Sequence, residues 1–198
     1  MYKNEKKIID FLEENTMIQS KELKNMGFSS SQIKSMLENG FLERINRGLY
    51  TFPNSMNDPY LELQLKFKKL IFSHVTALSL HGLTDVTPSK IMGTVPRDYN
   101  YQYISKVVDV DVVRVIANRY ELGIEEIQSP FGNKIKVYDI ERTLCDILLK
   151  RNVIDNRIIN ETYRNYFMSE KLNLNKLMKY AKLLRVEKHV RNYVQVYF

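Results

Sequence analysis

The stretch from Ser20 to Phe52 constrains the fold more than any other part of this sequence. Ser20 is expected to cap a short helix over residues 21–25, because its hydroxyl can accept a hydrogen bond from an early helix amide. Gly27 follows in a Met-Gly-Phe break and can adopt the positive φ of a tight turn. Apolar residues spaced by three and four then predict a second helix that ends at Gly40, with an inward face formed by Ile33, Met36 and Leu37.

After Gly40 the period changes from helical to two-residue alternation, and Arg47-Gly48 is expected to form the turn between two short strands. Ile18, just upstream, is placed to add a third short strand. Helix, glycine turn, helix and basic-tipped hairpin follow one another in the order of a winged helix-turn-helix. The residues before Ser20 predict one further helix over 5–14, which completes such a module.

Composition limits the alternatives. Of the 198 residues, 44% are hydrophobic, which is enough for the chain to form hydrophobic cores. Cys145 is the single cysteine, so an internal disulfide and a cysteine-based zinc site are excluded, and a reducing, cytoplasmic setting fits. No apolar run approaches the roughly 18 residues of a membrane span, and the first residues are polar, so we expect neither a membrane partner nor a secretory signal.

The segment 53–58 is rich in proline, asparagine and serine and is expected to be a linker. We therefore predict two domains, residues 1–55 and residues 56–198. Asp58-Pro59 opens the second with an N-cap carboxylate and a proline at the first helical position, and this helix is expected to reach about Phe72.

The remaining pattern predicts an α+β arrangement with a helical C-terminus. β-branched runs and alternation predict strands over 91–95, 107–116, 123–127 and 134–138. Apolar periodicity predicts helices over 73–82, 140–149, 155–168, 173–184 and 187–196.

Charge is distributed unevenly along the chain. Residues 150–198 contain eleven Lys or Arg and four acids, a difference of +7 that equals the net charge of the whole chain. Residues 1–149 therefore sum to zero. A basic, helical C-terminal part indicates a polyanionic partner, because each phosphate contact releases counterions. A solvated helix face would have the same composition.

Several segments together resemble the AbiEi antitoxin family of type IV toxin–antitoxin systems. The resemblance covers nearly the whole chain. It rests on Arg47-Gly48-Leu49-Tyr50 at the end of the wing, residues 73–83 with their sequence SHVTALSLHGL, Thr94-Val95-Pro96, and residues 139–146 with their sequence DIERTLCD.

The resemblance implies an N-terminal winged helix-turn-helix followed by a larger mixed α/β antitoxin domain. It also implies two activities: repression of the chain's own operon through operator DNA, and neutralisation of a nucleotidyltransferase-like toxin by the C-terminal domain. The alternative is a winged-helix transcriptional regulator of the same build without a toxin partner.

DNA contacts are expected at the exposed start of the second motif helix and on the wing. Short polar side chains at a helix start can reach phosphates or base edges in the major groove, and basic wing residues can reach the backbone or minor groove. The candidates are Ser30, Ser31, Gln32, Lys34, Ser35, Arg44, Asn46 and Arg47. The same module could instead serve protein interaction or dimerisation, since its first 55 residues carry eight basic side chains against seven acids.

A second set of basic residues lies near the C-terminus. Lys176, Lys179 and Lys182 recur every three residues, and Arg185 extends the series. No acid falls between Glu170 and Glu187, so the series predicts an unneutralised basic ridge. We assign Lys179, Lys182 and Arg185 to the DNA backbone; solubility or an acidic toxin surface are the alternatives.

Three other groups of polar residues have structural explanations. His74 and His81 lack a third metal ligand and suit capping and packing near Gly82. Arg142 and Asp146 have the spacing of an ion pair on one helix, next to Glu141. Asp109 and Asp111 share a strand face but lack the glycine-serine turn of nucleotidyl-transferring enzymes. We therefore expect no catalytic residues, no metal and no cofactor.

Overall fold

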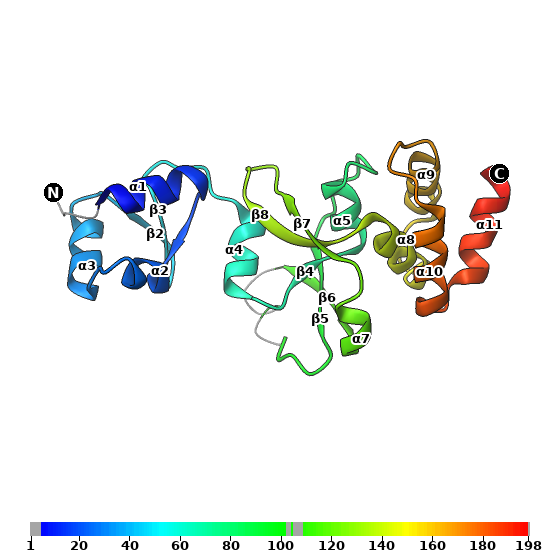
Figure 1. The fold of residues 1–198 in the computed structure, drawn as a ribbon, viewed down its shortest axis with the longest axis horizontal. Coiled ribbons are helices and arrows are strands. Elements are labelled where there is room, and N and C mark those ends of the chain that lie inside the picture. The colour runs from blue at the N-terminus through cyan, green and yellow to red at the C-terminus, as the bar shows by residue number, and fades with distance from the viewer. Residues whose placement is uncertain (1–4, 102–103, 105–108, 198) are drawn as a thin grey trace. The chain divides into compact units, whose positions relative to one another are not determined.

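The computed structural model describes residues 5–101, 104 and 109–197. Contacts within the chain divide it into two compact units. The first comprises Met1–Lys66 with Gln128–Ile135, and the second comprises Phe67–Ile127 with Lys136–Phe198. Figure 1 labels the helices and strands of both units. Every helix in the described part of the chain is too short or too polar to span a membrane.

The first unit contains the expected winged helix-turn-helix. Its elements in chain order are α1 (Glu5–Glu14), β1 (Ile18–Gln19), α2 (Ser20–Asn25), α3 (Ser30–Glu38), β2 (Glu43–Asn46), β3 (Leu49–Thr51) and α4 (Pro59–Lys66). The antiparallel sheet has the order β1-β3-β2, so Ile18 does add a third strand to the wing. Its core joins all three motif helices to the wing through Ile8, Leu12, Ile18, Leu23, Phe28, Ile33, Met36, Leu42 and Tyr50.

The segment expected to be a linker ends at Asp58, a buried residue with four hydrogen bonds that we call the Asp58 hub. Asp58 is 0% exposed, and its Oδ1 accepts hydrogen bonds from the first amides of α4, at 2.9 and 3.1 Å. Its Oδ2 accepts from Ser129 Oγ at 2.5 Å and from Asn133 Nδ2 at 2.8 Å. Asn133 also bonds both the hydroxyl and the amide of Thr16. The first compact unit therefore extends beyond residue 55, because Asp58 ties α4 to a hairpin tip some seventy residues away.

The second unit is built on a mixed five-stranded sheet of order β6-β5-β4-β8-β7. Strand β4 pairs antiparallel with β5 and parallel with β8, and β5 pairs parallel with β6. The strands are β4 (Ile71–Phe72), β5 (Ile91–Pro96), β6 (Val110–Val115), β7 (Ile124–Gln128) and β8 (Lys134–Tyr138).

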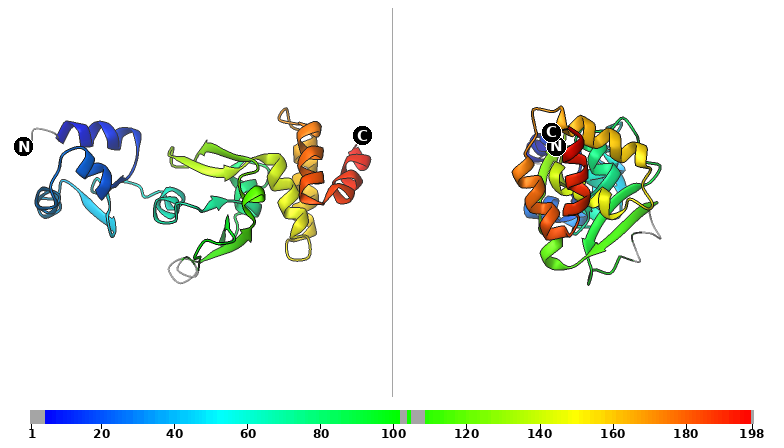
Figure 2. Two further views of the ribbon diagram at one scale, coloured as in Figure 1. Left: turned by 60° about the horizontal axis from the view of Figure 1, so that its bottom comes forward. Right: turned by 90° about the vertical axis from the view of Figure 1, so that its right-hand side faces the viewer.

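Helices of the second unit complete an α+β fold with a helical C-terminus, as the sequence predicts. They are α5 (His74–Leu80), α7 (Ala117–Tyr120), α8 (Ile140–Leu149), α9 (Asn156–Phe167), α10 (Leu174–Leu184) and α11 (Glu187–Tyr197). In Figures 1 and 2, α8 lies between the sheet and the C-terminal helices, with α9 and α10 on its far side. Helix α8 is accordingly buried from Ile140 to Leu148.

Two local predictions were wrong, and one short helix, α7, was not predicted. The helix expected to reach Phe72 ends at Lys66, because Ile71 and Phe72 form the central strand β4, whose pairing with two neighbours outweighs helical periodicity. Ser20 is the first residue of α2 and not its cap; the cap is Gln19, whose amide donates to Glu22 Oε2 at 2.6 Å. The strand expected over 107–116 is present as β6, and residues 107 and 108 lie outside the described range.

Candidate nucleic-acid interface

Local sequence fixes the geometry of the helix-turn-helix. Gly27 has φ +96°, which lets the chain leave α2 and turn toward α3 without side-chain strain. Ser29 and Gln32 then form a capping box at the start of α3: Ser29 Oγ accepts from the Gln32 amide at 3.2 Å, and Gln32 Oε1 accepts from the Ser29 amide at 2.8 Å. The first turn of α3 is therefore held in place while its outer side stays exposed.

Side chains from α2, α3 and the wing surround one hollow of about 440 Å³ on the first unit. Its basic members come from three different elements: Lys24 from α2, Lys34 from α3 and Arg44 from β2. Hydroxyl groups and two apolar side chains complete the lining. These are Ser20, Ser30, Tyr50, Ile33 and Leu37. We call this surface the basic hollow.

The pKa of Tyr50 indicates that the basic hollow favours negative charge. Burial raises the pKa of its phenol, but hydrogen bonds from Ser20 and Arg44 and the charges of Arg44 and Lys24 outweigh burial, so the pKa lies below its usual value. The Ser20 hydroxyl lies 3.2 Å from the phenol oxygen, and the Arg44 guanidinium carbon lies 5.8 Å from the ring centroid. A site that favours a phenolate favours other oxyanions, including a phosphate.

The structure places some of the predicted contact residues in the basic hollow and some outside it. Ser30, Lys34 and Arg44 line it. Two predicted residues are exposed but do not line the hollow: Ser31 in the first turn of α3 and Arg47 at the wing tip. Ser35 is half-buried. Gln32 is engaged in the capping box, and Asn46 donates from Nδ2 to the Glu62 carboxylate on α4. The roles of these residues in DNA binding stay predictions.

Sequence reasoning missed Ser20, Lys24 and Tyr50. Lys24 lies in the last turn of α2, and no residue of this helix was among the predicted contacts. Tyr50 and Ser20 are thirty residues apart and meet because β1 pairs with β3. The order of the elements could have indicated these residues, because the first motif helix and the wing both flank the second motif helix in this fold.

The C-terminal basic ridge is shorter than predicted. Lys176 is not free: its Nζ lies 2.9 Å from Glu141 Oε2 and 3.2 Å from Asp139 Oδ2, and both carboxylates are buried. The sequence pattern could not show this, because these acids lie at the start of α8, more than thirty residues before Lys176. Lys179, Lys182 and Arg185 remain exposed on α10 and its C-cap.

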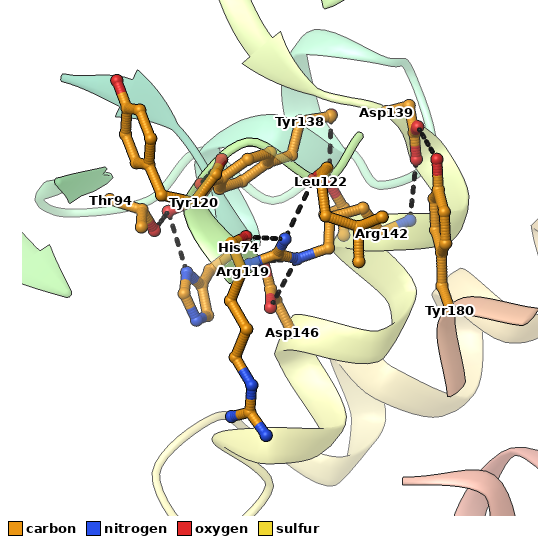
Figure 3. A network of polar contacts seen from close by, with 12 residues as sticks. His74, Thr94, Arg119, Tyr120, Leu122, Tyr138, Asp139, Arg142, Asp146 and Tyr180 are labelled. Carbon is orange, nitrogen blue, oxygen red and sulfur yellow. Dashed lines mark hydrogen bonds and ion pairs between the residues drawn. The ribbon is translucent and has the colours of Figure 1, made fainter. Parts of the chain in front are cut away.

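Residues considered for catalysis or metal binding have structural partners. Arg142 Nε lies 3.0 Å from both carboxylate oxygens of Asp146, which confirms the predicted ion pair (Figure 3). Burial lowers the pKa of His74 to about 3, so its imidazole is neutral, and its Nδ1 lies 2.9 Å from Ser73 Oγ. His81 Nε2 lies 2.8 Å from the Tyr138 carbonyl oxygen. The described part of the chain contains no cluster of three potential metal ligands.

Comparison with known proteins identifies the N-terminal part. Residues 3–87 match the family model described as transcriptional regulator, AbiEi antitoxin N-terminal domain, which confirms the resemblance stated above for these residues. The fold is similar to the crystal structure of the RV2827C protein from Mycobacterium tuberculosis, with a TM-score of 0.57. That alignment covers 88% of this chain and 70% of the other at 15% identity, so it concerns the fold alone. No curated protein matches the chain.

Proposed function

We propose that this chain, whose residues 3–87 match the AbiEi antitoxin N-terminal domain of transcriptional regulators, is an antitoxin that represses its own operon. The observation that carries the proposal is the basic hollow, where cations from α2, α3 and the wing converge beside the exposed start of α3. Operator DNA is its partner, so the protein acts in the cytoplasm.

The basic hollow suits a DNA backbone segment at the edge of a major groove. Lys24, Lys34 and Arg44 would contact phosphates, while Ser30 and Ser31 at the start of α3 would face base edges. Phosphate contacts supply most of the affinity and base contacts supply the specificity. The ion pair of Lys34 with Glu38 does not oppose this, because both side chains are mostly exposed and their Nζ–Oε1 distance is 3.6 Å.

The test is binding of the full-length protein to duplex DNA from upstream of its own gene, measured by fluorescence anisotropy at several salt concentrations. Lys24→Ala combined with Lys34→Ala should weaken binding, and the slope of log affinity against log salt should fall by about 0.9 for each phosphate that the variant no longer neutralises. Lys7→Ala combined with Lys21→Ala is the matched control, since both lysines are exposed in the same unit but do not line the hollow. Equal affinity and slope in the double variant and the control would contradict the proposal.

For the second activity we propose that residues 56–198 neutralise a nucleotidyltransferase-like toxin encoded in the same operon. The support is the match of the N-terminal part to an antitoxin family, together with the large folded unit that follows it. Co-expression of the full chain with the neighbouring reading frame should restore growth that the neighbouring frame alone arrests. If that frame is harmless to cells, the chain is a winged-helix regulator without a toxin partner.

We assign the exposed cations Lys179, Lys182 and Arg185 to the DNA backbone as a second contact. The reason is the low net charge of the first 55 residues, whose eight basic side chains are nearly balanced by seven acids. Such contacts would add affinity without reading sequence.

A further inference from the structure

A further group of basic side chains lies in the second unit, and none of its members is among the residues assigned above to DNA. Arg97, Arg114, Arg119 and Lys150 line one hollow of about 470 Å³. The remainder of the lining is aliphatic and comes from Val112, Val113, Val115 and Ile116. We call this hollow the arginine pocket. Its four cations are spread widely along the sequence, and the distribution of charge along the chain therefore did not reveal it.

The parallel pairing of β5 and β6 brings the first two arginines together. Arg114 lies opposite Val95 in the strand register, and the Arg97 amide donates to the Val115 carbonyl oxygen at 2.8 Å just beyond the end of β5. Both arginines therefore lie at the carboxyl ends of adjacent parallel strands, an edge where many α/β sheets bind ligands. Arg114 is further held over the ring of Tyr101, with its guanidinium carbon 4.7 Å from the ring centroid.

The other two cations are positioned by the buried network of α8. The carbonyl oxygens of Arg119 and Leu122 accept hydrogen bonds from Arg142 Nη1, which fixes the main chain of α7. Figure 3 shows the Arg119 guanidinium directed away from this network. Lys150 is the C-cap residue of α8, where its amide donates to the Asp146 carbonyl at 3.2 Å.

No carboxylate among the described residues lines the arginine pocket or forms an ion pair with these four cations. The charge of Lys150 also acts within the protein, where it adds to burial in lowering the pKa of the nearby His74. Like charges gathered in one concave site repel one another, and a bound anion would relieve this repulsion. The pocket therefore has the features of an anion site.

We propose that the arginine pocket binds a small ligand with several phosphate groups, of the class of a nucleoside triphosphate. Its volume is within the range of about 300–1,000 Å³ typical of small-molecule sites. Guanidinium groups form paired hydrogen bonds with phosphate oxygens, and the aliphatic wall offers a surface for a base or sugar. Unlike the basic hollow, the arginine pocket is not formed by a helix-turn-helix that could enter a groove, and half of its lining is aliphatic, so it fits a compact polyphosphate better than a duplex.

The test is calorimetric titration of the full-length protein with ATP and, separately, with inorganic triphosphate, both without divalent cations. The double variant Arg97→Gln and Arg114→Gln should weaken binding of both probes at least tenfold. The matched control is Lys171→Gln with Lys188→Gln, which removes the same charge from exposed positions of the same unit and should leave binding within twofold. Thermal melts of all three proteins establish that they are folded.

Tighter binding of ATP than of triphosphate would support a nucleoside contact, and equal binding would support a polyphosphate site without one. The proposal is overturned if the wild-type protein binds neither probe at millimolar concentration. It is also overturned if the control loses as much affinity as the arginine variant. Duplex DNA whose binding depends on Arg97 and Arg114, and which ATP does not displace, would assign the pocket to nucleic acid instead.

Discussion

Arg142 is the group whose removal should harm the second unit most. Its side chain is 1% exposed and forms an ion pair with Asp146, which is 5% exposed at the side chain. Its Nη1 donates to two main-chain carbonyls near α7, and its guanidinium carbon lies 4.3 Å from the centroid of the Tyr138 ring (Figure 3). The substitution Arg142→Met keeps an unbranched side chain and removes the charge and the donors.

The expected cost follows from what is left behind. Removing one partner of a buried ion pair typically costs about 3–5 kcal/mol, because the remaining charge is uncompensated. Two carbonyl oxygens also lose a donor. Against a total stability of about 5–15 kcal/mol, this loss should bring the variant near the limit of folding at pH 8.

The cost should depend on pH. Burial raises the pKa of Asp146 to about 6 even though Arg142 lowers it, so without Arg142 the pKa must lie higher. A carboxyl whose pKa is raised in the folded state stabilises fully below its unfolded pKa of about 3.9, and this contribution is lost as pH rises through the folded pKa. Between pH 6 and 8 the variant should therefore lose up to about 1.4 kcal/mol per pH unit more than the wild type does.

Urea unfolding at pH 5, 6, 7 and 8, followed by circular dichroism, measures this difference. Adding Asp146→Asn to Arg142→Met removes the buried charge and should recover part of the stability at pH 8 but little at pH 5. If the free energy of unfolding of Arg142→Met has the same pH dependence as the wild type, the reasoning about Asp146 is wrong. A double variant less stable than the single one at pH 8 would refute it as well.

Three further experiments test other parts of the protein. Lys176→Met should lower the free energy of unfolding in urea by about 1–3 kcal/mol. This is less than for a fully buried ion pair, because the Lys176 side chain is 36% exposed. Lys179→Met should leave the free energy of unfolding almost unchanged. Asp58→Ala should cost about 3 kcal/mol or more because it removes an N-cap and two buried hydrogen bonds; thermal unfolding indistinguishable from wild type would disprove the hub. Glutamate at Lys179, Lys182 and Arg185 should weaken operator binding without changing base preference; if the variant keeps its operator affinity and no longer protects cells, the ridge belongs to the toxin.

Much of the fold could be read from the sequence because local signals agree with it. Helix α1 and the helix and strand over 134–149 have the bounds that periodicity and capping predict. The wing was predicted from alternation and from Gly48, whose φ of +77° is the left-handed conformation that its hairpin turn needs. These features depend on residues a few positions apart, so the local sequence pattern is sufficient to specify them.

The sequence by itself determined the order of the motif, the α+β character and the exposed start of α3, because each depends on neighbours in the chain. Only the tertiary structure decided which charges are free and which groups converge. It joined Lys176 to buried acids on α8, brought Ser20 and Tyr50 together, and gathered four cations in the arginine pocket. The physical reason is that strand pairing and helix packing between distant parts of the chain set the distances between these side chains. The distribution of charge along the sequence contains no information about those distances.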